Sequence, residues 1–166
     1  MFYKLIQSVD NYLSFPEAKA HCDIPCGIYD PAPAQIDALT VVRMMDLMIA
    51  LDQGEDKEKL DYHNSLSRYI TIKEEHAEKA KHEIRVIWGD YIKDPHVEKH
   101  PELPGLVHNI MQLGSKCRQT ADREQGLKFV EAINQFAEIF WDTKSVKTKK
   151  AKAPYAPGLE MVYPEL

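Results

Sequence analysis

Apolar residues recur at steps of three and four positions along most of this chain, which is the spacing of one face of an α-helix. The pattern predicts four helices, at about residues 31–51, 60–92, 102–118 and 122–142. No segment of any length alternates with a period of two, and no repeat of solenoid length recurs. We therefore expect an all-α fold, an antiparallel four-helix bundle.

Capping and turn residues indicate where these helices begin and end. Asp30 followed by Pro31 is a good helix start, because aspartate accepts from free N–H groups and proline is tolerated in the first turn. Gly54 predicts the end of the first helix, and Asp94 with Pro95 predicts the end of the second.

The two ends of the chain lack the helical pattern. Residues 1–20 end in Ala-Lys-Ala, which imitates a signal-peptidase site, but Asp10 and Glu17 interrupt the apolar stretch that an export signal needs. The segment is interpreted either as a removable leader or as an ordinary first element of the domain. Residues 145–166, which contain several lysines and prolines, are expected to form a tail that is mobile or lies over a neighbour.

Composition narrows the class of protein. The 166 residues are enough for one domain, and the net charge of -5 argues against a partner among nucleic acids or anionic membranes. No apolar run approaches the roughly 18 residues that a membrane-spanning helix needs. Three cysteines cannot all pair within one chain and do not suggest a disulfide scaffold, so we expect a cytoplasmic protein.

Two cysteines near the start of the first helix form a candidate metal site. Cys22 and Cys26 are four positions apart with Pro25 and Gly27 at the turn, so a tight loop could bring both sulfurs to one metal. A zinc site usually has four ligands, and no second cysteine pair exists. Cys117 lies on the apolar stripe of the third helix and is interpreted as a buried, inert thiol.

Backbone groups could complete the ligand set if the chain were cut between Ala20 and His21. His21 would then offer an α-amine and an imidazole, and Cys22 would offer an amide nitrogen as well as its sulfur. Together with Cys26 this makes an in-plane set of two nitrogens and two sulfurs, which suits Ni(II) or Cu(II) better than zinc.

Residues 21–31, His-Cys-Asp-Ile-Pro-Cys-Gly-Ile-Tyr-Asp-Pro, resemble the nickel hook of the nickel superoxide dismutases, and every fixed position of that motif is filled. We call residues 21–31 the hook. The resemblance continues through Ile-Trp-Gly-Asp-Tyr at 87–91, Pro-His-Val-Glu-Lys at 95–99, Pro-Glu-Leu at 101–103 and Ile-Phe-Trp-Asp-Thr-Lys at 139–144. It covers most of a domain at 21–144, preceded by a cleavable leader at 1–20.

The resemblance implies a Ni(II)/Ni(III) cycle that converts superoxide to oxygen and hydrogen peroxide, with one nickel ion per subunit. It implies that His21 supplies its α-amine and an axial imidazole, Cys22 an amide nitrogen and a thiolate, and Cys26 a second thiolate. It implies that Tyr29 is the gate residue beside the metal and that Asp23 helps to shape the approach of the substrate. Pro25 and Gly27 would form the turn around the metal. It further implies a homohexamer of four-helix bundles and a processing protease.

The sequence departs from the family pattern at two supporting positions. Where the family has a glutamate and an arginine that hold the axial imidazole, this chain has Asp37 and His76. Asp37 is kept as a candidate support for His21, whereas His76 could equally be a surface histidine. Lys93 is a candidate for steering the anionic substrate. His96 and His100 are interpreted as exposed loop histidines.

Two other functions remain open from the residues alone. In the first, the chain is a helical metal-binding or thiol-redox module without turnover, in which Cys22 and Cys26 form a disulfide or hold zinc. In the second, it is a structural bundle that associates through aromatic faces and binds no metal.

Overall fold

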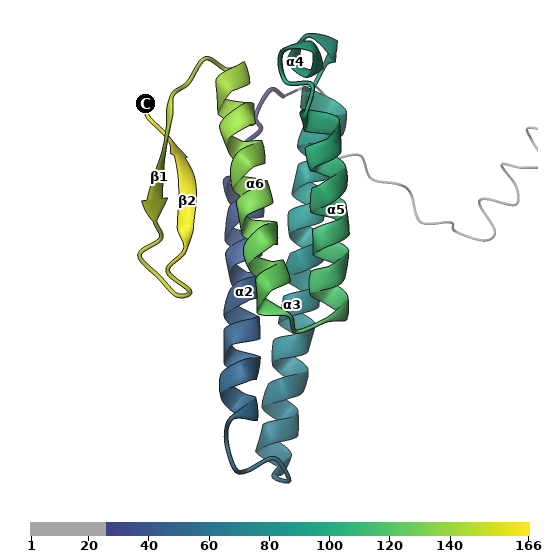
Figure 1. Cartoon of the computed structure of the whole chain (residues 1–166), viewed down its shortest axis with the longest axis vertical. Coiled ribbons are helices and arrows are strands. Elements are labelled where there is room, and N and C mark those ends of the chain that lie inside the picture. Colours follow the sequence, from purple (N-terminus) through teal and green to yellow (C-terminus); the bar gives the residue numbers. More distant parts are fainter. Residues whose placement is uncertain (1–25) are drawn as a thin grey trace, which may run out of the picture.

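The computed structural model describes residues 26–166, and within that range four long helices form an antiparallel bundle (Figure 1). The helices are α2 (Ala32–Asp52), α3 (Leu60–Val86), α5 (Leu103–Gln119) and α6 (Arg123–Thr143). α2 and α5 each pack against both α3 and α6. The predicted bundle is confirmed. None of the helices in these residues is long and apolar enough to cross a membrane.

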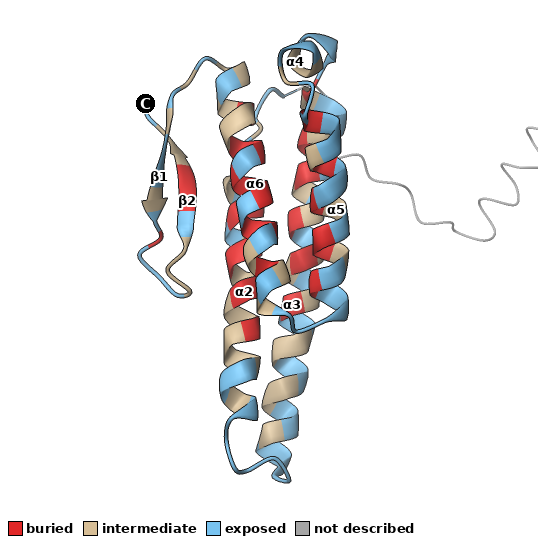
Figure 2. Cartoon of the chain, viewed as in Figure 1, coloured by how far each residue is buried: buried red, intermediate tan, exposed pale blue. Residues whose placement is uncertain are grey.

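The hydrophobic core lies between the four helices, on the faces that they turn toward one another (Figure 2). Gly126 of α6 brings that helix close to α2, because a Cβ at this position would lie 3.0 Å from the side chains of Val42 and Met45. The largest fully buried side chains include Phe129, Phe136, Phe140, Leu39, Met45, Ile84 and Ile110.

The second predicted helix, expected to run to residue 92, is interrupted near its end. α3 ends at Val86 and continues as a π-helical turn, η1 (Ile87–Tyr91), before the chain turns into a short helix, α4 (Asp94–Lys99). Pro95 therefore does more than end a helix: it lies in the first turn of the next one, where its missing N–H is tolerated. The expected loop around His96 is helical.

The segment expected to be a mobile tail folds as a β-hairpin. Strands β1 (Thr148–Lys152) and β2 (Glu160–Pro164) pair antiparallel, and Met161 and Val162 of β2 are both buried. Buried side chains on both faces of a strand give no alternation in the sequence, and β1 contains three lysines. The period-two signal that predicts a strand is therefore absent here.

A buried lysine binds the main-chain carbonyls at the C-terminus of α5. Lys73 of α3 is 2% exposed, and its ammonium donates hydrogen bonds to the carbonyls of Cys117, Arg118 and Thr120 at 2.6, 2.7 and 2.8 Å. These carbonyls lie at the helix C-terminus, where partners within the helix are lacking and a cation is favoured. Burial lowers the pKa of Lys73. This contact fixes α3 to the end of α5.

Candidate metal centre

The described chain begins inside the hook. Cys26 is exposed, and its Sγ lies 4.0 Å from the carbonyl oxygen of Ile28. Gly27 has a φ of 71°, in the left-handed region where a side chain would be strained, so the turn after Cys26 requires glycine. Four predicted site residues lie outside the described residues: His21, Cys22, Asp23 and Pro25.

The hook leads directly into the first turn of α2. Asp30 accepts a hydrogen bond from the Ala32 N–H through its Oδ1 at 2.7 Å, and the Pro31 carbonyl accepts from the Gln35 N–H at 3.1 Å. The helix begins at Ala32, one residue later than expected, because Pro31 itself occupies the capping position. The end of the hook is thus held by a bundle helix.

Tyr29, the predicted gate residue, packs on an aromatic cluster at this end of the bundle. Its ring centroid lies 5.6 Å from that of Tyr91, which in turn stacks on His96 at 5.2 Å and contacts Phe140 at 5.0 Å. The hydroxyls of Tyr91 and Thr143 share a hydrogen bond of 2.8 Å. The sequence places Tyr91 in the family-like motif at 87–91, but no local pattern predicts its contact with the hook.

Two lysines adjoin this cluster, Lys144 through its side chain and Lys93 through its main chain. Lys93 is exposed and its main-chain N–H donates to His96 Nδ1 at 3.1 Å. Lys144, which sequence analysis did not single out, has its Nζ 4.5 Å from the centroid of the Tyr91 ring, within the range of a cation–π interaction. Cations grouped at one site attract a small anion to a protein of net negative charge.

Asp37 and His76 contact each other between α2 and α3. Asp37 Oδ1 lies 2.6 Å from His76 Nδ1, and the two side chains are only 14% and 24% exposed. His76 is therefore not a free surface histidine. The two residues that stand in for the glutamate and arginine of the family motif form a pair with each other.

His100 also differs from the expected exposed histidine. Its side chain is 15% exposed, and its Nε2 lies 2.8 Å from Asp142 Oδ2, which also accepts from the ammonium of Lys99 at 2.6 Å. The hydrogen bonds from Lys99 and His100 lower the pKa of the Asp142 carboxyl. These contacts join α4 to the end of α6. His96 lies on α4, where its ring stacks on Tyr91.

Cys117 is the buried thiol that the sequence predicts. It is fully buried in the core, and burial raises its pKa from 9.0 to about 11. Within residues 26–166 it belongs to no group of three or more histidine, cysteine or acidic side chains that could hold a metal ion. Cys117 is therefore not a candidate for the metal centre.

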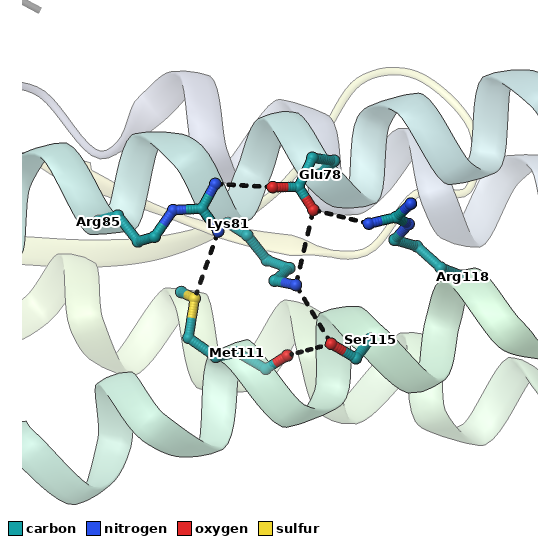
Figure 3. Close-up of polar contacts among 6 residues, drawn as sticks. All are labelled: Glu78, Lys81, Arg85, Met111, Ser115 and Arg118. Carbon is teal, nitrogen blue, oxygen red and sulfur yellow. Dashed lines mark hydrogen bonds and ion pairs between the residues drawn. The ribbon is translucent and has the colours of Figure 1, made fainter. Parts of the chain in front are cut away.

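A second polar cluster joins α3 to α5 (Figure 3). The Glu78 carboxylate accepts from Arg85 at 2.7 Å and Arg118 at 2.9 Å, and it forms an ion pair with Lys81 at 3.6 Å. Lys81 also donates to Ser115 Oγ at 3.1 Å. An open cleft of about 470 Å³ lies beside these residues. With one carboxylate shared among three cations, this cluster is an ion-pair network between helices and has no metal-ligand character.

The sulfur and nitrogen donors of the hook suit a nickel ion. Residues 26–166 contain no cluster of three or more histidine, cysteine or acidic side chains that could hold a metal ion. The hook offers an exposed sulfur at Cys26 and, in its first two residues, a second sulfur and nitrogen donors. Thiolates combined with nitrogen donors suit nickel or copper.

Comparison with known proteins gives one consistent family. The model of the nickel-containing superoxide dismutases matches residues 16–144. The superoxide dismutase [Ni] of Streptomyces seoulensis is 41% identical over 128 residues, which cover 77% of this chain and 91% of that protein. The corresponding protein of Streptomyces coelicolor is 42% identical over 125 residues, covering 75% and 88%.

Solved structures agree with this result. The native structure of nickel superoxide dismutase is 40% identical, with a TM-score of 0.65, and the match covers 75% of this chain and 99% of that chain. A crystal structure with nickel ligation corresponding to the oxidised state gives the same values. The matched length and identity are well beyond a likeness of fold alone. The chain belongs to the nickel-containing superoxide dismutase family.

Proposed function

We propose that the chain converts superoxide to oxygen and hydrogen peroxide at a nickel ion held by His21, Cys22 and Cys26, after cleavage between Ala20 and His21. The observation that carries this proposal is the complete hook motif joined to a bundle of the same family. Bound there, nickel supplies one-electron redox chemistry. The free amine at His21 exists only after cleavage, so the uncut chain is a proenzyme.

The residues around the hook would then hold it and admit the substrate. Tyr29 rests on Tyr91 at the bundle end and limits access to the metal from that side. Lys93 and Lys144 attract the superoxide anion, and they offset the repulsion expected from a net charge of -5. Asp37 and His76 support the imidazole of His21 as a pair, directly or through water.

We also propose that the mature protein is a cytoplasmic homohexamer and that a dedicated protease removes residues 1–20. Two features support assembly: Ile28 in the hook is 81% exposed, and Ile36 in the first turns of α2 is 47% exposed. Exposed apolar side chains close to a functional loop are typical of protein contacts. The low cysteine count supports the cytoplasm.

Intact-mass measurement, elemental analysis and a superoxide dismutation assay on protein from the native host test the proposal together. The expected result is a chain that begins at His21, carries about one nickel ion and is active. An uncut, folded chain without nickel or activity would overturn it, and an uncut chain with zinc would favour the metal-binding or thiol-redox alternative.

Substitution of His21 tests its proposed role as a metal ligand independently of the folding of the bundle. His21→Ala is expected to leave the bundle folded and to reduce dismutation strongly, because the imidazole that would bind the nickel ion is lost. His63→Ala, which removes an exposed histidine from α3, is the matched control and should keep full activity. Equal activity of the two variants would contradict the role of His21.

A further inference from the structure

The C-terminal hairpin, residues 148–164, has no role assigned by the family. The family model ends at residue 144, and the match to the native solved structure uses 99% of that chain while leaving a quarter of this one uncovered. In Figure 1 the hairpin lies along the flank of the bundle beside α6. It contacts α6 through β2.

The hairpin is firmly packed. Ala153, Met161 and Val162 are 4%, 3% and 2% exposed, which means that the hairpin has an apolar interior shared with the bundle. On its other strand, the Lys150 ammonium lies 3.2 Å from Glu131 and 3.5 Å from Glu138, both on α6. Burial of this extent is typical of a permanent part of the domain.

Two buried amide side chains connect the hairpin to both α2 and α6. Asn134 of α6 donates to the Glu160 carbonyl of β2 at 2.9 Å. The amide of Gln35 of α2 faces the main chain of Val162: with its oxygen toward the Val162 N–H, the contacts to that N–H and to the Val162 carbonyl are 2.8 and 3.2 Å. In the opposite orientation its nitrogen donates to Asn134 Oδ1 at 2.8 Å.

Both amides are 2% exposed, so these contacts are shielded from water. A buried amide without a partner is costly, and one side of β2 would otherwise leave its main-chain groups unpaired. Asn134 through the Glu160 carbonyl, and Gln35 in the orientation that faces Val162, are therefore the partners of β2 on the side away from β1. The result is a three-way junction of α2, α6 and the hairpin.

This junction lies next to the hook in the chain. The main-chain N–H of Gln35 donates to the carbonyl of Pro31, the last residue of the hook. We infer that the C-terminal hairpin is a clasp that holds the first turns of α2 against α6 and thereby positions the metal hook. Gln35 and Asn134 are the positioning residues of this clasp. The part of the inference that concerns the hook rests on the proposed function.

Hydrogen exchange in the full chain tests the clasp. Gln35→Met and Asn134→Leu keep much of the side-chain volume while removing the amide groups. Each is expected to speed exchange of the amides at residues 35–40 and 160–163 about tenfold, because hydrogen bonds that restrain these segments are lost. Lys128→Ala, an exposed change on α6, is the control and should change neither segment.

The pattern of exchange decides between a clasp and a general stabiliser. Faster exchange in α2 and the hairpin, with α3 and α5 unchanged, supports the clasp. Faster exchange throughout the bundle, or in the hairpin alone, would overturn it. This measurement needs no metal, so it remains decisive even if the proposed nickel chemistry fails.

Release of nickel to a chelator tests the link to the hook. In processed, nickel-loaded protein well below its unfolding temperature, Gln35→Met is expected to release nickel several-fold faster than the parent and the Lys128→Ala control. Unchanged release from a variant whose α2 amides exchange faster would show that the clasp does not position the hook. Failure of the parent itself to bind nickel would instead count against the proposed function.

Discussion

Asp37 and His76, at the positions where the family pattern has a glutamate and an arginine, contact each other in the folded chain. Both side chains are shorter than the glutamate and arginine of the motif, and both are largely withdrawn from water. Their contact at 2.6 Å joins α2 to α3. A pair that is screened from solvent in this way interacts more strongly than an exposed pair.

A double-mutant cycle on Asp37→Asn and His76→Gln measures this interaction. The expected coupling in the free energy of unfolding is about 1 kcal/mol, above the roughly 0.3–0.5 kcal/mol typical of an exposed helical pair. Urea unfolding of the two single variants, the double variant and the parent gives the value. The matched control is the exposed pair of Glu75 and Lys79, whose contact is 2.7 Å. Equal coupling in both pairs would contradict the prediction.

At this scale the sequence predicts local chemistry better than it predicts contacts. The proposed ligands could be named because His21, Cys22 and Cys26 lie within one short loop. The pairing of Asp37 with His76 could not be predicted, because the two are 39 residues apart and meet only after α2 and α3 pack. The same holds for the contact of Tyr29 with Tyr91.

At the scale of elements, apolar periodicity predicts the long helices to within a few residues but not the short elements. α4 has six residues, too few for a periodic pattern, and its first residues also look like the end of α3. The hairpin is hidden for another reason. Met161 and Val162 are adjacent in β2 and both buried, so β2 is buried on both faces and its sequence does not alternate.

The ion-pair network between α3 and α5 makes their packing dependent on pH. Partial burial alone would raise the pKa of Glu78, but the hydrogen bond from Arg85 and the charges of Lys81, Arg85 and Arg118 lower it overall. Because the folded-state pKa lies below the unfolded value, the network contributes stability above the unfolded pKa and loses it as the pH falls through the folded pKa.

Glu78→Gln is therefore expected to be less stable than the parent at pH 7, and the difference should shrink between about pH 5 and pH 3. Urea unfolding across this range provides the measurement. Glu98→Gln, an exposed change on α4, is the control and should track the parent at every pH. A difference between Glu78→Gln and the parent that stays constant down to pH 3 would show that the carboxylate charge is not what stabilises the network.

At the scale of the whole molecule, the proposed chemistry depends on segments outside the four helices. The hook precedes α2 and the hairpin follows α6, yet both meet the first turns of α2. Ile28 and Ile36 lie in and just after the hook. If the bundles assemble as proposed, we expect the contacts to include this region, so that assembly and the metal site share residues.

Ile36→Lys tests this arrangement. A lysine at a subunit contact would bring an unpaired charge into the interface, so the variant is expected to shift from hexamers to smaller species while remaining folded. Leu60→Lys makes a similar substitution at a side chain that is 83% exposed, in the first residue of α3 and therefore beyond the far end of α2 from Ile36, and should leave assembly unchanged. Sedimentation velocity of the two processed variants and the parent gives the species present. A hexamer that persists in Ile36→Lys would place the subunit contacts elsewhere, whereas loss of hexamers in both variants would mean that added positive charge, not position, controls assembly.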